Sequence, residues 1–358
     1  MKYNVYRRAT KEIRVGNVKI GGTSPISLQS MTNTDSHDVE ATYNQALMLS
    51  QAGCDVLRIT APDIESVSTF GELKMRGITI PLVADIHFDY KIAVAAAVAG
   101  VDKIRINPGN IGSKDKIREV VLACREYSVP IRIGVNSGSL ETHILKKYGY
   151  PTAEALVESA LYHADLLREL DFHDIAISVK SSDVQTMILA NRLLAEKTDY
   201  PIHLGVTEAG ARDRALVKSS IGIGTLLAEG IGDTIRVSLT DDPIEEIYAA
   251  RAILDSLNLS EKRGMDIIAC PTCGRTQIDL ISLHREFEAR IREEGLDRKN
   301  IKVALMGCAV NGPGEAREAD IGIAGGKGEA LLFKKGQIVS KIKEESIIDR
   351  LIAEIKAL

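Results

Sequence analysis

Residues 130–136, Pro-Ile-Arg-Ile-Gly-Val-Asn, and residues 174–180, Asp-Ile-Ala-Ile-Ser-Val-Lys, are two short runs rich in β-branched side chains. A helical pattern fills residues 153–170 between them, so this stretch predicts a strand, a helix and a second, parallel strand. Strands buried in a parallel sheet should be almost wholly apolar, yet each run contains a cation, Arg132 or Lys180. The pattern therefore indicates a parallel sheet with charge at one end.

The same alternation extends over residues 24–258. It predicts further strands at residues 25–30, 55–60, 80–86, 103–107, 202–207 and 233–238, and further helices at residues 39–52, 90–99, 114–127, 182–198, 213–228 and 243–257. Eight strands, each followed by a helix, over about 235 residues are typical of a TIM (β/α)8 barrel. A doubly wound sheet is the competing fold, but it would usually have fewer strands and a glycine-rich first turn. Gly222-Ile-Gly224 lacks the third glycine, and Gly325-Gly-Lys327-Gly is not followed by Ser or Thr.

A second, smaller domain follows the barrel. The polar segment 258–264, Asn-Leu-Ser-Glu-Lys-Arg-Gly, is a predicted linker between a substrate-binding barrel domain at 1–258 and an α+β domain at 264–358. Within the second domain the pattern predicts strands at 266–269, 301–306 and 320–324, a hairpin at 329–339, and helices at 278–294 and 343–356.

Composition excludes several classes of protein. The chain has 358 residues, 45% of them hydrophobic and 26% charged, with a net charge of −4. Without a basic excess, without tryptophan and with 4% aromatic residues, it is not expected to bind nucleic acid. No apolar run reaches the ~18 residues of a membrane span, and no signal peptide is evident. Five cysteines, an odd number, argue against a disulfide framework and favour a cytoplasmic protein.

Three of the five cysteines are grouped in the last quarter of the chain, as Cys270-Pro-Thr-Cys273 and Gly307-Cys308-Ala-Val-Asn311-Gly-Pro-Gly-Glu315. Three thiolates can hold an iron–sulfur cluster with one iron left for an exchangeable ligand, and Glu315 is a candidate for that weak fourth ligand. The alternatives are a zinc site with His284 as fourth ligand, a redox dithiol, and simple burial. The two remaining cysteines, Cys54 and Cys124, lie in apolar patterns and are expected to be buried thiols.

Five cations occupy equivalent places near the ends of predicted strands: Arg58, Arg105, Arg132, Lys180 and Arg236. A spacing of two places several of them on one face with Thr60, Asn107, Asn136 or Ser238, and that face should line the barrel near its C-terminal mouth. Ion pairs with carboxylates such as Asp85 and Glu208 could satisfy two or three cations. Burying all five for packing alone would cost too much, so the set favours a phosphate or diphosphate ligand.

Polar residues beside these cations are candidates for the remaining roles. Asn107, Asn136, Thr207 and Ser238 could orient hydroxyl groups of a ligand. Asp85, His87 and Glu208 are the candidates for proton transfer.

Several longer motifs resemble the 4-hydroxy-3-methylbut-2-enyl diphosphate synthase family. They are Ser-Leu-Gln29-Ser-Met31-Thr-Asn-Thr, Ala-Asp85-Ile-His87-Phe, Arg105-Ile-Asn107-Pro-Gly109-Asn110, Gly-Val-Asn136-Ser-Gly, Cys270-Pro-Thr-Cys273-Gly-Arg and Gly-Cys308-Ala-Val-Asn311-Gly-Pro-Gly-Glu315-Ala. The resemblance covers the chain almost end to end, and its length is similar to that of the two-domain bacterial form.

The resemblance implies an oxidoreductase of the non-mevalonate isoprenoid pathway. It implies a [4Fe–4S] cluster bound by Cys270, Cys273, Cys308 and Glu315, with Asn311 and Glu208 facing the substrate. The implied reaction is reductive ring opening and dehydration of 2-C-methyl-D-erythritol 2,4-cyclodiphosphate to (E)-4-hydroxy-3-methylbut-2-enyl diphosphate. Reduced flavodoxin or ferredoxin would supply the two electrons.

The predicted last barrel helix suggests how such a protein would assemble. Fifteen residues at ~1.5 Å each carry the chain about 22 Å from the mouth towards the opposite end. A head-to-tail homodimer would bring each second domain to its neighbour's mouth. Two other functions remain open: a non-redox barrel enzyme, such as a phosphate-ester lyase or pterin-type transferase with a zinc-stapled accessory domain, and a non-catalytic module that binds a diphosphate metabolite and senses iron or oxygen.

Overall fold

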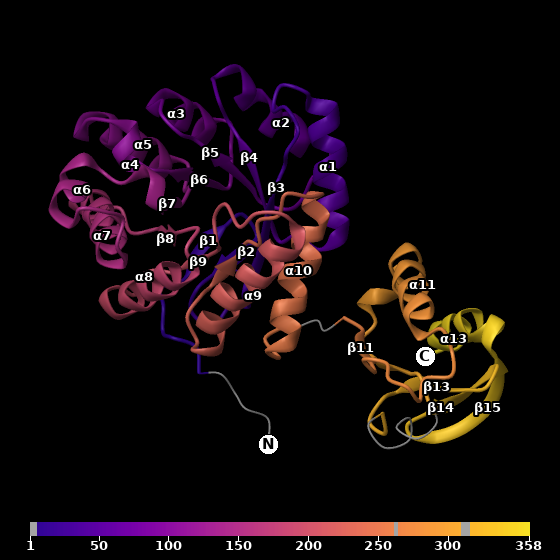
Figure 1. Cartoon of the computed structure of the whole chain (residues 1–358). Coiled ribbons are helices and arrows are strands. Elements are labelled where there is room, and N and C mark those ends of the chain that lie inside the picture. Colours follow the sequence, from indigo (N-terminus) through magenta and orange to yellow (C-terminus); the bar gives the residue numbers. More distant parts are fainter. Residues whose placement is uncertain (1–5, 261–263, 309–315) are drawn as a thin grey trace. The chain divides into compact units, whose positions relative to one another are not determined.

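The computed structural model describes residues 6–260, 264–308 and 316–358. The chain divides into two compact units, Met1–Ser260 and Glu261–Leu358. In Figure 1 the first unit is a ring of strands surrounded by helices, and the second is a small sheet with helices. Among the helices of the described ranges, none combines the length and the apolar character that a membrane crossing requires.

Eight parallel strands form the first unit's sheet, in the order β8-β7-β6-β5-β4-β3-β10-β9. Their bounds are β3 Ser27–Met31, β4 Val56–Thr60, β5 Leu82–Asp85, β6 Lys103–Ile106, β7 Ile131–Asn136, β8 Ile175–Lys180, β9 His203–Leu204 and β10 Thr234–Ile235. A parallel bridge between Ile177 and Ile202 joins β8 to β9 and closes the ring. The predicted TIM (β/α)8 fold is confirmed.

Helices cover the outside of this ring. They are α1 Val39–Ala52, α2 Ser68–Met75, α3 Tyr90–Val98, α4 Pro108–Ile111, α5 Lys114–Glu126, α6 Thr142–Tyr148, α7 Ala153–Glu169, α8 Val184–Lys197, α9 Arg212–Ala228 and α10 Pro243–Ser256, with 3₁₀ turns at Glu65–Val67 and Ser137–Ser139. Several begin at a side chain that accepts a hydrogen bond from a main-chain N–H of the first turn, namely Asp38, Asp89, Thr152, Asp183 and Asp242. Such caps fix where each helix starts, and therefore where the preceding loop must end.

Besides the helices α2, α4 and α6, which are not among the predicted ones, two features of the first unit differ from the prediction. The pairing of β9 and β10 ends at Leu204 and Ile235, earlier than the predicted 207 and 238. Gly205 comes directly after β9, and a Cβ there would lie 2.8 Å from both the Lys180 Nζ and the Arg236 carbonyl oxygen. The other feature is a hairpin, β1 Ile13–Val15 and β2 Val18–Ile20, that sequence patterns did not predict. Its apolar side chains pack with Val56, Val83 and Ala176.

The second unit is a five-stranded sheet in the order β11-β12-β13-β14-β15. The strands are β11 Asp266–Ala269, β12 Lys302–Met306, β13 Ile321–Gly326, β14 Glu329–Lys334 and β15 Gln337–Lys343, and the helices are α11 Leu280–Glu293 and α13 Ile347–Lys356, with 3₁₀ turns at Leu296–Arg298 and Glu344–Ser346. β11, β12 and β13 are parallel, whereas β14 and β15 are antiparallel neighbours. Phe287 of α11 and Leu351 of α13 are fully buried in one core with the sheet, as expected for a two-layer α+β domain.

Candidate active site

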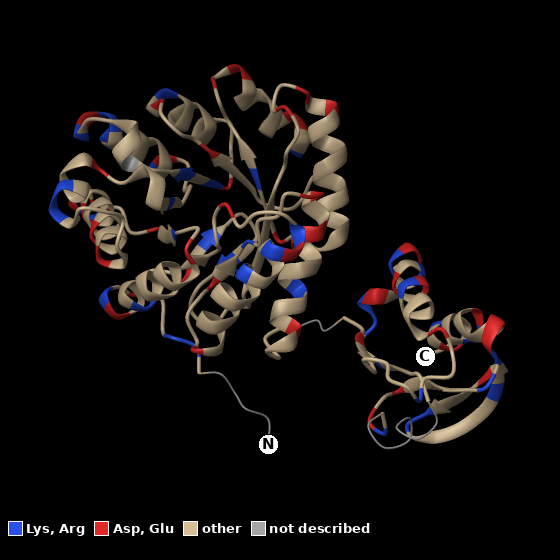
Figure 2. Cartoon of the chain, in the orientation of Figure 1, with Lys and Arg blue, Asp and Glu red and all other residues tan. Residues whose placement is uncertain are grey.

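The interior of the barrel is polar near the ends of its strands. Arg132 and Arg105 are 1% and 5% exposed, and they are register partners on the adjacent strands β7 and β6. Their neighbours in sequence, such as Ile104 and Ile133, face the other way and pack in the large core under the helices. Figure 2 accordingly shows Lys and Arg within the barrel strands as well as on the helices. The structure therefore places these cations inside the barrel, as the period-2 pattern predicted.

Asp85, at the end of β5, is the centre of the largest ion-pair group in this interior. One of its oxygens lies 2.6 Å from Arg58 Nη2 and the other 3.1 Å from Arg105 Nη1. The His87 Nε2 lies 3.0 Å from the first of these oxygens. Burial by itself would raise the pKa of Asp85, but Arg58, His87 and Arg105 together hold that pKa well below its usual value. Asp85 is therefore a carboxylate that fixes two guanidinium groups.

Arg236 has a different carboxylate partner, which the sequence interpretation missed. Glu246, in the first turns of α10, accepts hydrogen bonds from Arg236 Nε at 3.1 Å and from Nη2 at 3.0 Å. Ser30 Oγ donates a further bond to the same carboxylate, at 2.8 Å. Glu246 is only 3% exposed, so this bidentate pair is buried and fixes the direction of the Arg236 side chain.

Arg132 and Lys180 form no ion pair with a carboxylate among the residues that the structure describes. Arg132 Nη1 donates to Gln29 Oε1 at 3.2 Å, which is a neutral acceptor. Burial, reinforced by the other cations of the interior, lowers the pKa of both side chains well below the usual values. Two cations in such surroundings would gain stabilisation from a bound anion.

Two glycines make room for these side chains. A Cβ at Gly134 would lie 2.5 Å from Arg105 Nε, and a Cβ at Gly205 would lie 2.8 Å from Lys180 Nζ. Neither glycine has a positive φ, so the requirement is for space and not for backbone freedom. Glycine within a strand commonly marks such a close approach.

The four predicted hydroxyl-orienting residues differ in how closely they are held. Asn107 is 2% exposed, donates to Ser139 Oγ at 3.1 Å and accepts from the main-chain N–H of Gly109. Asn136, Thr207 and Ser238 are half-buried. Asn136 is the register partner of Lys180 across β7 and β8. Asn107 and Asn136 therefore border the cationic interior at neighbouring strand ends.

The remaining two candidates for proton transfer are more exposed than Asp85. The His87 side chain is 49% exposed while it contacts Asp85. Glu208 is exposed and has a φ of 49°, in the left-handed region that few non-glycine residues occupy. Strained backbone of this kind is often found at functional loops. The structure brings His87 to the cation group through Asp85, whereas it pairs Glu208 with none of the five cations.

The three grouped cysteines lie in two neighbouring segments of the second unit. The Gly307 N–H donates to Cys270 Sγ at 3.3 Å, and the Gln277 N–H donates to the Gly307 carbonyl at 3.0 Å. Cys308 is buried and Cys273 is exposed. Hydrogen bonds from the main chain and side chain of Arg275 lower the pKa of the Cys273 thiol.

These contacts hold the Cys270 turn against the Cys308 loop. Soft thiolate donors that receive N–H bonds are the donor set that iron–sulfur clusters use, so the chemistry of these residues fits such a group, although the structure does not gather the three thiols as ligands of one ion. Glu315 and Asn311 lie outside the described residues. Within the described ranges, no three His, Cys, Asp or Glu side chains are gathered closely enough to hold a metal ion. His284 is half-buried and faces Glu288 at 3.7 Å. Cys54 and Cys124 are buried, as predicted.

Sequence interpretation missed four residues of the barrel interior: Gln29, Lys103, His203 and Glu246. Lys103 precedes Arg105 by two positions, so the period-2 rule that found Arg105 could also have found Lys103. Gln29 and His203 are fully buried polar residues on predicted strands, and the same rule applies to them. Glu246 gave no such signal, because only the fold brings α10 to the end of β10.

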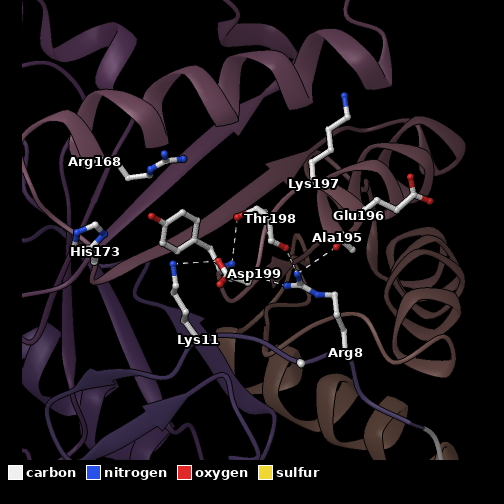
Figure 3. A pocket seen from close by; sticks show the side chains of 11 residues that line it. Arg8, Lys11, Arg168, His173, Ala195, Glu196, Lys197, Thr198 and Asp199 are labelled. Carbon is white, nitrogen blue, oxygen red and sulfur yellow. Dashed lines mark hydrogen bonds and ion pairs between the residues drawn. The ribbon is translucent and has the colours of Figure 1, made fainter.

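A separate pocket of about 660 Å³ lies away from these residues, where the chain entering β1 meets the loops before β8 and β9. Its lining includes Arg8, Lys11, Arg168, His173 and Asp199, and Figure 3 shows Lys11 and Arg8 turned towards the 198–199 turn. Lys11 pairs with Asp199 at 3.2 Å. None of the candidate site residues lines this pocket.

Comparisons with known proteins agree on the family. Residues 10–251 match the GcpE TIM-barrel domain, and residues 266–357 match the GcpE protein C-terminal domain. The chain is 58% identical, over 98% of its length and 99% of the relative's, to 4-hydroxy-3-methylbut-2-en-1-yl diphosphate synthase (flavodoxin) from Clostridium perfringens. The corresponding protein from Geobacillus thermodenitrificans is 54% identical over 99% of this chain and 93% of its own.

Solved structures show similarity of the fold alone. Dihydropteroate synthase from Thermus thermophilus aligns with a TM-score of 0.52 at 12% identity, covering 69% of this chain and 98% of that one. Type I 3-dehydroquinate dehydratase from Clostridium difficile aligns with a TM-score of 0.51 at 16% identity, covering 70% and 97%. Both covered shares are close to the share of the chain that the barrel unit occupies.

Fold and site together define a (β/α)8-barrel enzyme with a cationic interior, joined to a smaller α+β domain that carries three thiols. The two domain matches cover most of the chain, and the curated relatives match it almost end to end. The chain belongs to the GcpE family, the family of 4-hydroxy-3-methylbut-2-en-1-yl diphosphate synthases.

Proposed function

We propose that this chain converts 2-C-methyl-D-erythritol 2,4-cyclodiphosphate into (E)-4-hydroxy-3-methylbut-2-enyl diphosphate. The overall conversion takes up two electrons and one proton, opens the ring at a carbon–oxygen bond and releases one water. The single observation that carries the proposal is the cationic interior. Arg58, Arg105 and Arg236 are held by two buried carboxylates, while Arg132 and Lys180 face no carboxylate among the described residues.

The cations have complementary parts in binding a cyclic diphosphate. Arg58, Arg105 and Arg236 are fixed by Asp85 and Glu246, so their remaining N–H groups are oriented before the ligand arrives. Arg132 and Lys180 would gain a paired counter-charge when an anion binds, because neither forms an ion pair with a carboxylate within the described ranges. Guanidinium forks match phosphate oxygens bidentately. The product keeps the diphosphate, so the same side chains hold it throughout the reaction.

Asp85, His87 and Glu208 are the residues that we propose for moving protons. His87 Nε2 is 3.0 Å from Asp85, which orients the imidazole, and the exposed half of the ring can exchange protons with solvent. Glu208 is exposed at the loop after β9, where its unusual backbone angle directs the side chain. We propose that Asn107, Asn136, Thr207 and Ser238 orient the sugar-derived hydroxyl groups, and that Asn311 faces the substrate.

We propose Cys270, Cys273, Cys308 and Glu315 as the ligands of a [4Fe–4S] cluster. Such a cluster supplies electrons one at a time and offers an iron with an exchangeable ligand. The three thiols of the second unit and the N–H bond to Cys270 Sγ support this choice. Reduced flavodoxin is the proposed donor, because the curated relatives carry that word in their names; ferredoxin is an alternative donor. Free cysteines support a cytoplasmic setting.

We further propose a head-to-tail homodimer. α10 has 14 residues, and at ~1.5 Å per residue it carries the chain about 21 Å away from the barrel mouth. A second copy could then bring its cysteine-bearing domain to that mouth. Two results together would contradict this arrangement: a chain that sediments as a monomer, and an activity per chain that stays constant on dilution.

The proposed function is tested on the full chain purified without oxygen. We expect about four iron and four sulfide per chain, and conversion of the cyclodiphosphate when reduced flavodoxin is present. Arg132→Met should keep the iron content and lose diphosphate affinity, whereas Cys308→Ser should lose iron and keep diphosphate binding to the barrel. Full turnover by the protein without iron, or equal diphosphate affinity in Arg132→Met, would overturn the assignment.

A further inference from the structure

Beneath the proposed substrate cations, the barrel interior holds a second group of polar atoms without partners. Six buried side-chain atoms of the strands have no hydrogen-bond partner: Ser27 Oγ, Gln29 Nε2, Arg58 Nε, Lys103 Nζ, Arg132 Nε and His203 Nε2. They belong to β3, β4, β6, β7 and β9 and therefore come from around the ring. An unpaired buried donor costs about 1–3 kcal/mol, more when charged, so such a concentration needs an explanation.

Lys103 is the deepest charged member of this group. It is 0% exposed, and it precedes Arg105 by two residues on the same face, which puts it about 6–7 Å further from the mouth. Its register partner on β5 is Val83, which packs against the β1–β2 hairpin at the closed side of the interior. No carboxylate pairs with Lys103 in the described ranges. The ammonium therefore lies between an apolar seal below and Arg132 above.

The neighbours of Lys103 are donors and offer few acceptors. Gln29 Oε1 already accepts from Arg132 Nη1 at 3.2 Å, which leaves the Gln29 amide N–H groups facing the interior. Both Asp85 oxygens are engaged by Arg58, Arg105 and His87. The main-chain carbonyls of these strands are used in the parallel ladders.

His203 is the other deep member of the group. Its Nδ1 faces Thr234 Oγ1 at 3.4 Å, and its Nε2 has no partner. Burial has the largest effect on His203 and lowers the pKa of its imidazole. The nearby charges of Arg132, Lys180 and Lys103 lower this pKa further, well below its usual value. The imidazole is therefore neutral, and it adds no positive charge to the group. Its Nε2, like the Lys103 Nζ, is a buried atom without a hydrogen-bond partner, and the charge of Lys103 acts on this imidazole.

We propose that the barrel holds a small monatomic anion of the halide class between Lys103, Arg132 and Gln29, below the site that binds the substrate diphosphate. The anion would accept hydrogen bonds from the Lys103 ammonium, the Arg132 Nε–H and the Gln29 amide. A monatomic ion suits the position because it accepts from all directions and has no oxygen atoms that would need donors of their own. The site shares Arg132 with the proposed diphosphate site but lies further from the mouth, at Lys103 and Gln29, and the inference does not depend on the proposed catalysis.

The bound anion would also stabilise the barrel. It would keep Lys103 charged in surroundings where burial and Arg132 otherwise lower the pKa of the amine. A ligand that binds only the folded state stabilises it in proportion to the logarithm of its concentration. Chloride should therefore raise the unfolding temperature by about 3 °C per tenfold concentration above its Kd.

The test compares sodium chloride with sodium gluconate, whose anion is a large carboxylate and not a monatomic ion, at equal ionic strength. The wild-type chain should show the chloride-dependent rise, and Lys103→Met should not. Lys114→Met is the matched control, because Lys114 is exposed and pairs with Glu169. It should keep the full rise. Equal chloride dependence in wild type and Lys103→Met would overturn the proposal.

A second measurement does not rely on the variant's folding. Crystals of the wild-type full chain grown in bromide should show an anomalous peak within about 3.5 Å of Lys103 Nζ and Arg132 Nε. The peak should remain when inorganic diphosphate fills the mouth. Absence of the peak, with water at that position, would overturn the proposal. Loss of the peak on adding diphosphate would overturn it as well, because the two sites would then be one.

Discussion

Asp85→Asn tests whether this carboxylate is the main counter-charge of the barrel interior. Asparagine keeps the shape of the side chain and removes its charge, while Arg58 and Arg105 stay in place. Asp85 is 1% exposed and lies 2.6 and 3.1 Å from the two guanidinium groups. Removing one partner of a buried ion pair costs about 3–5 kcal/mol. At about 2–4 °C per kcal/mol, the unfolding temperature of the barrel should fall by roughly 10 °C.

The control is Glu229→Gln, which removes a surface carboxylate that is paired with the single arginine Arg192. Glu229 accepts bonds from Arg192 at 2.9 and 2.5 Å, but the two side chains are 38% and 41% exposed. Solvent screens such a pair, so little change in unfolding temperature is expected. Thermal unfolding of both variants in low-phosphate buffer measures the difference. Similar small shifts in the two variants would refute the reasoning.

The same substitution should act in the opposite direction on anion binding. In the wild-type chain Asp85 would compete with a bound diphosphate for Arg58 and Arg105, and its charge would repel that ligand. Asp85→Asn should therefore bind inorganic diphosphate more tightly by titration calorimetry and should recover much of its lost stability when diphosphate is present. Turnover should nevertheless fall, because His87 loses the partner that orients it. Weaker diphosphate binding in the variant would mean that Asp85 positions the arginines more than it competes for them.

Three further predictions concern neighbouring parts of the barrel. Gly134→Ala should weaken diphosphate binding by about tenfold or more, because a Cβ 2.5 Å from Arg105 Nε displaces that guanidinium; unchanged affinity would contradict it. Glu246→Gln should lower the unfolding temperature, since Arg236 loses its carboxylate; an unchanged unfolding temperature would contradict it. Burial raises the pKa of Glu141, but its hydrogen bond with His163 outweighs this and lowers that pKa to about 2. The ionised Glu141 should thus stabilise the fold fully above about pH 4.5 and lose this contribution towards pH 2. In acid-unfolding curves, Glu141→Gln should therefore lose less stability over that pH range than the wild-type chain does.

Strand and helix patterns predicted most of the barrel because buried parallel strands and amphipathic helices have distinct periods. α1 was predicted to the residue, α5 starts where it was predicted, and the starts of nine other barrel strands and helices shifted by only one or two positions, as for β7. The hairpin β1–β2 was missed because its three-residue strands are too short to show alternation. The α4 and α6 helices were missed for the same reason: they are four and seven residues long.

Only part of the candidate site, too, could be predicted from the sequence. Arg58, Arg105 and Arg132 could be placed on one face from spacing alone, because side-chain direction along a strand is set by the backbone. Their partners could not be predicted, since Asp85 was one of several available acids and Glu246 comes from a helix. The depth of Lys103 and the pairing of Arg132 with Gln29 depend on how far the barrel closes. Such contacts between distant strands have no local sequence signal.

The barrel interior is polar, unlike the apolar cores that stabilise most proteins, and its polar and apolar side chains lie in separate layers. Apolar packing is confined to the outer layer, where strands meet helices, and to the hairpin seal beneath Val56 and Val83. Between them, Gly134 and Gly205 leave space that the side chains of Arg105 and Lys180 occupy. A sequence selected for stability alone would fill this space with branched side chains. If an anion binds in the barrel as proposed, its binding would offset this cost in stability.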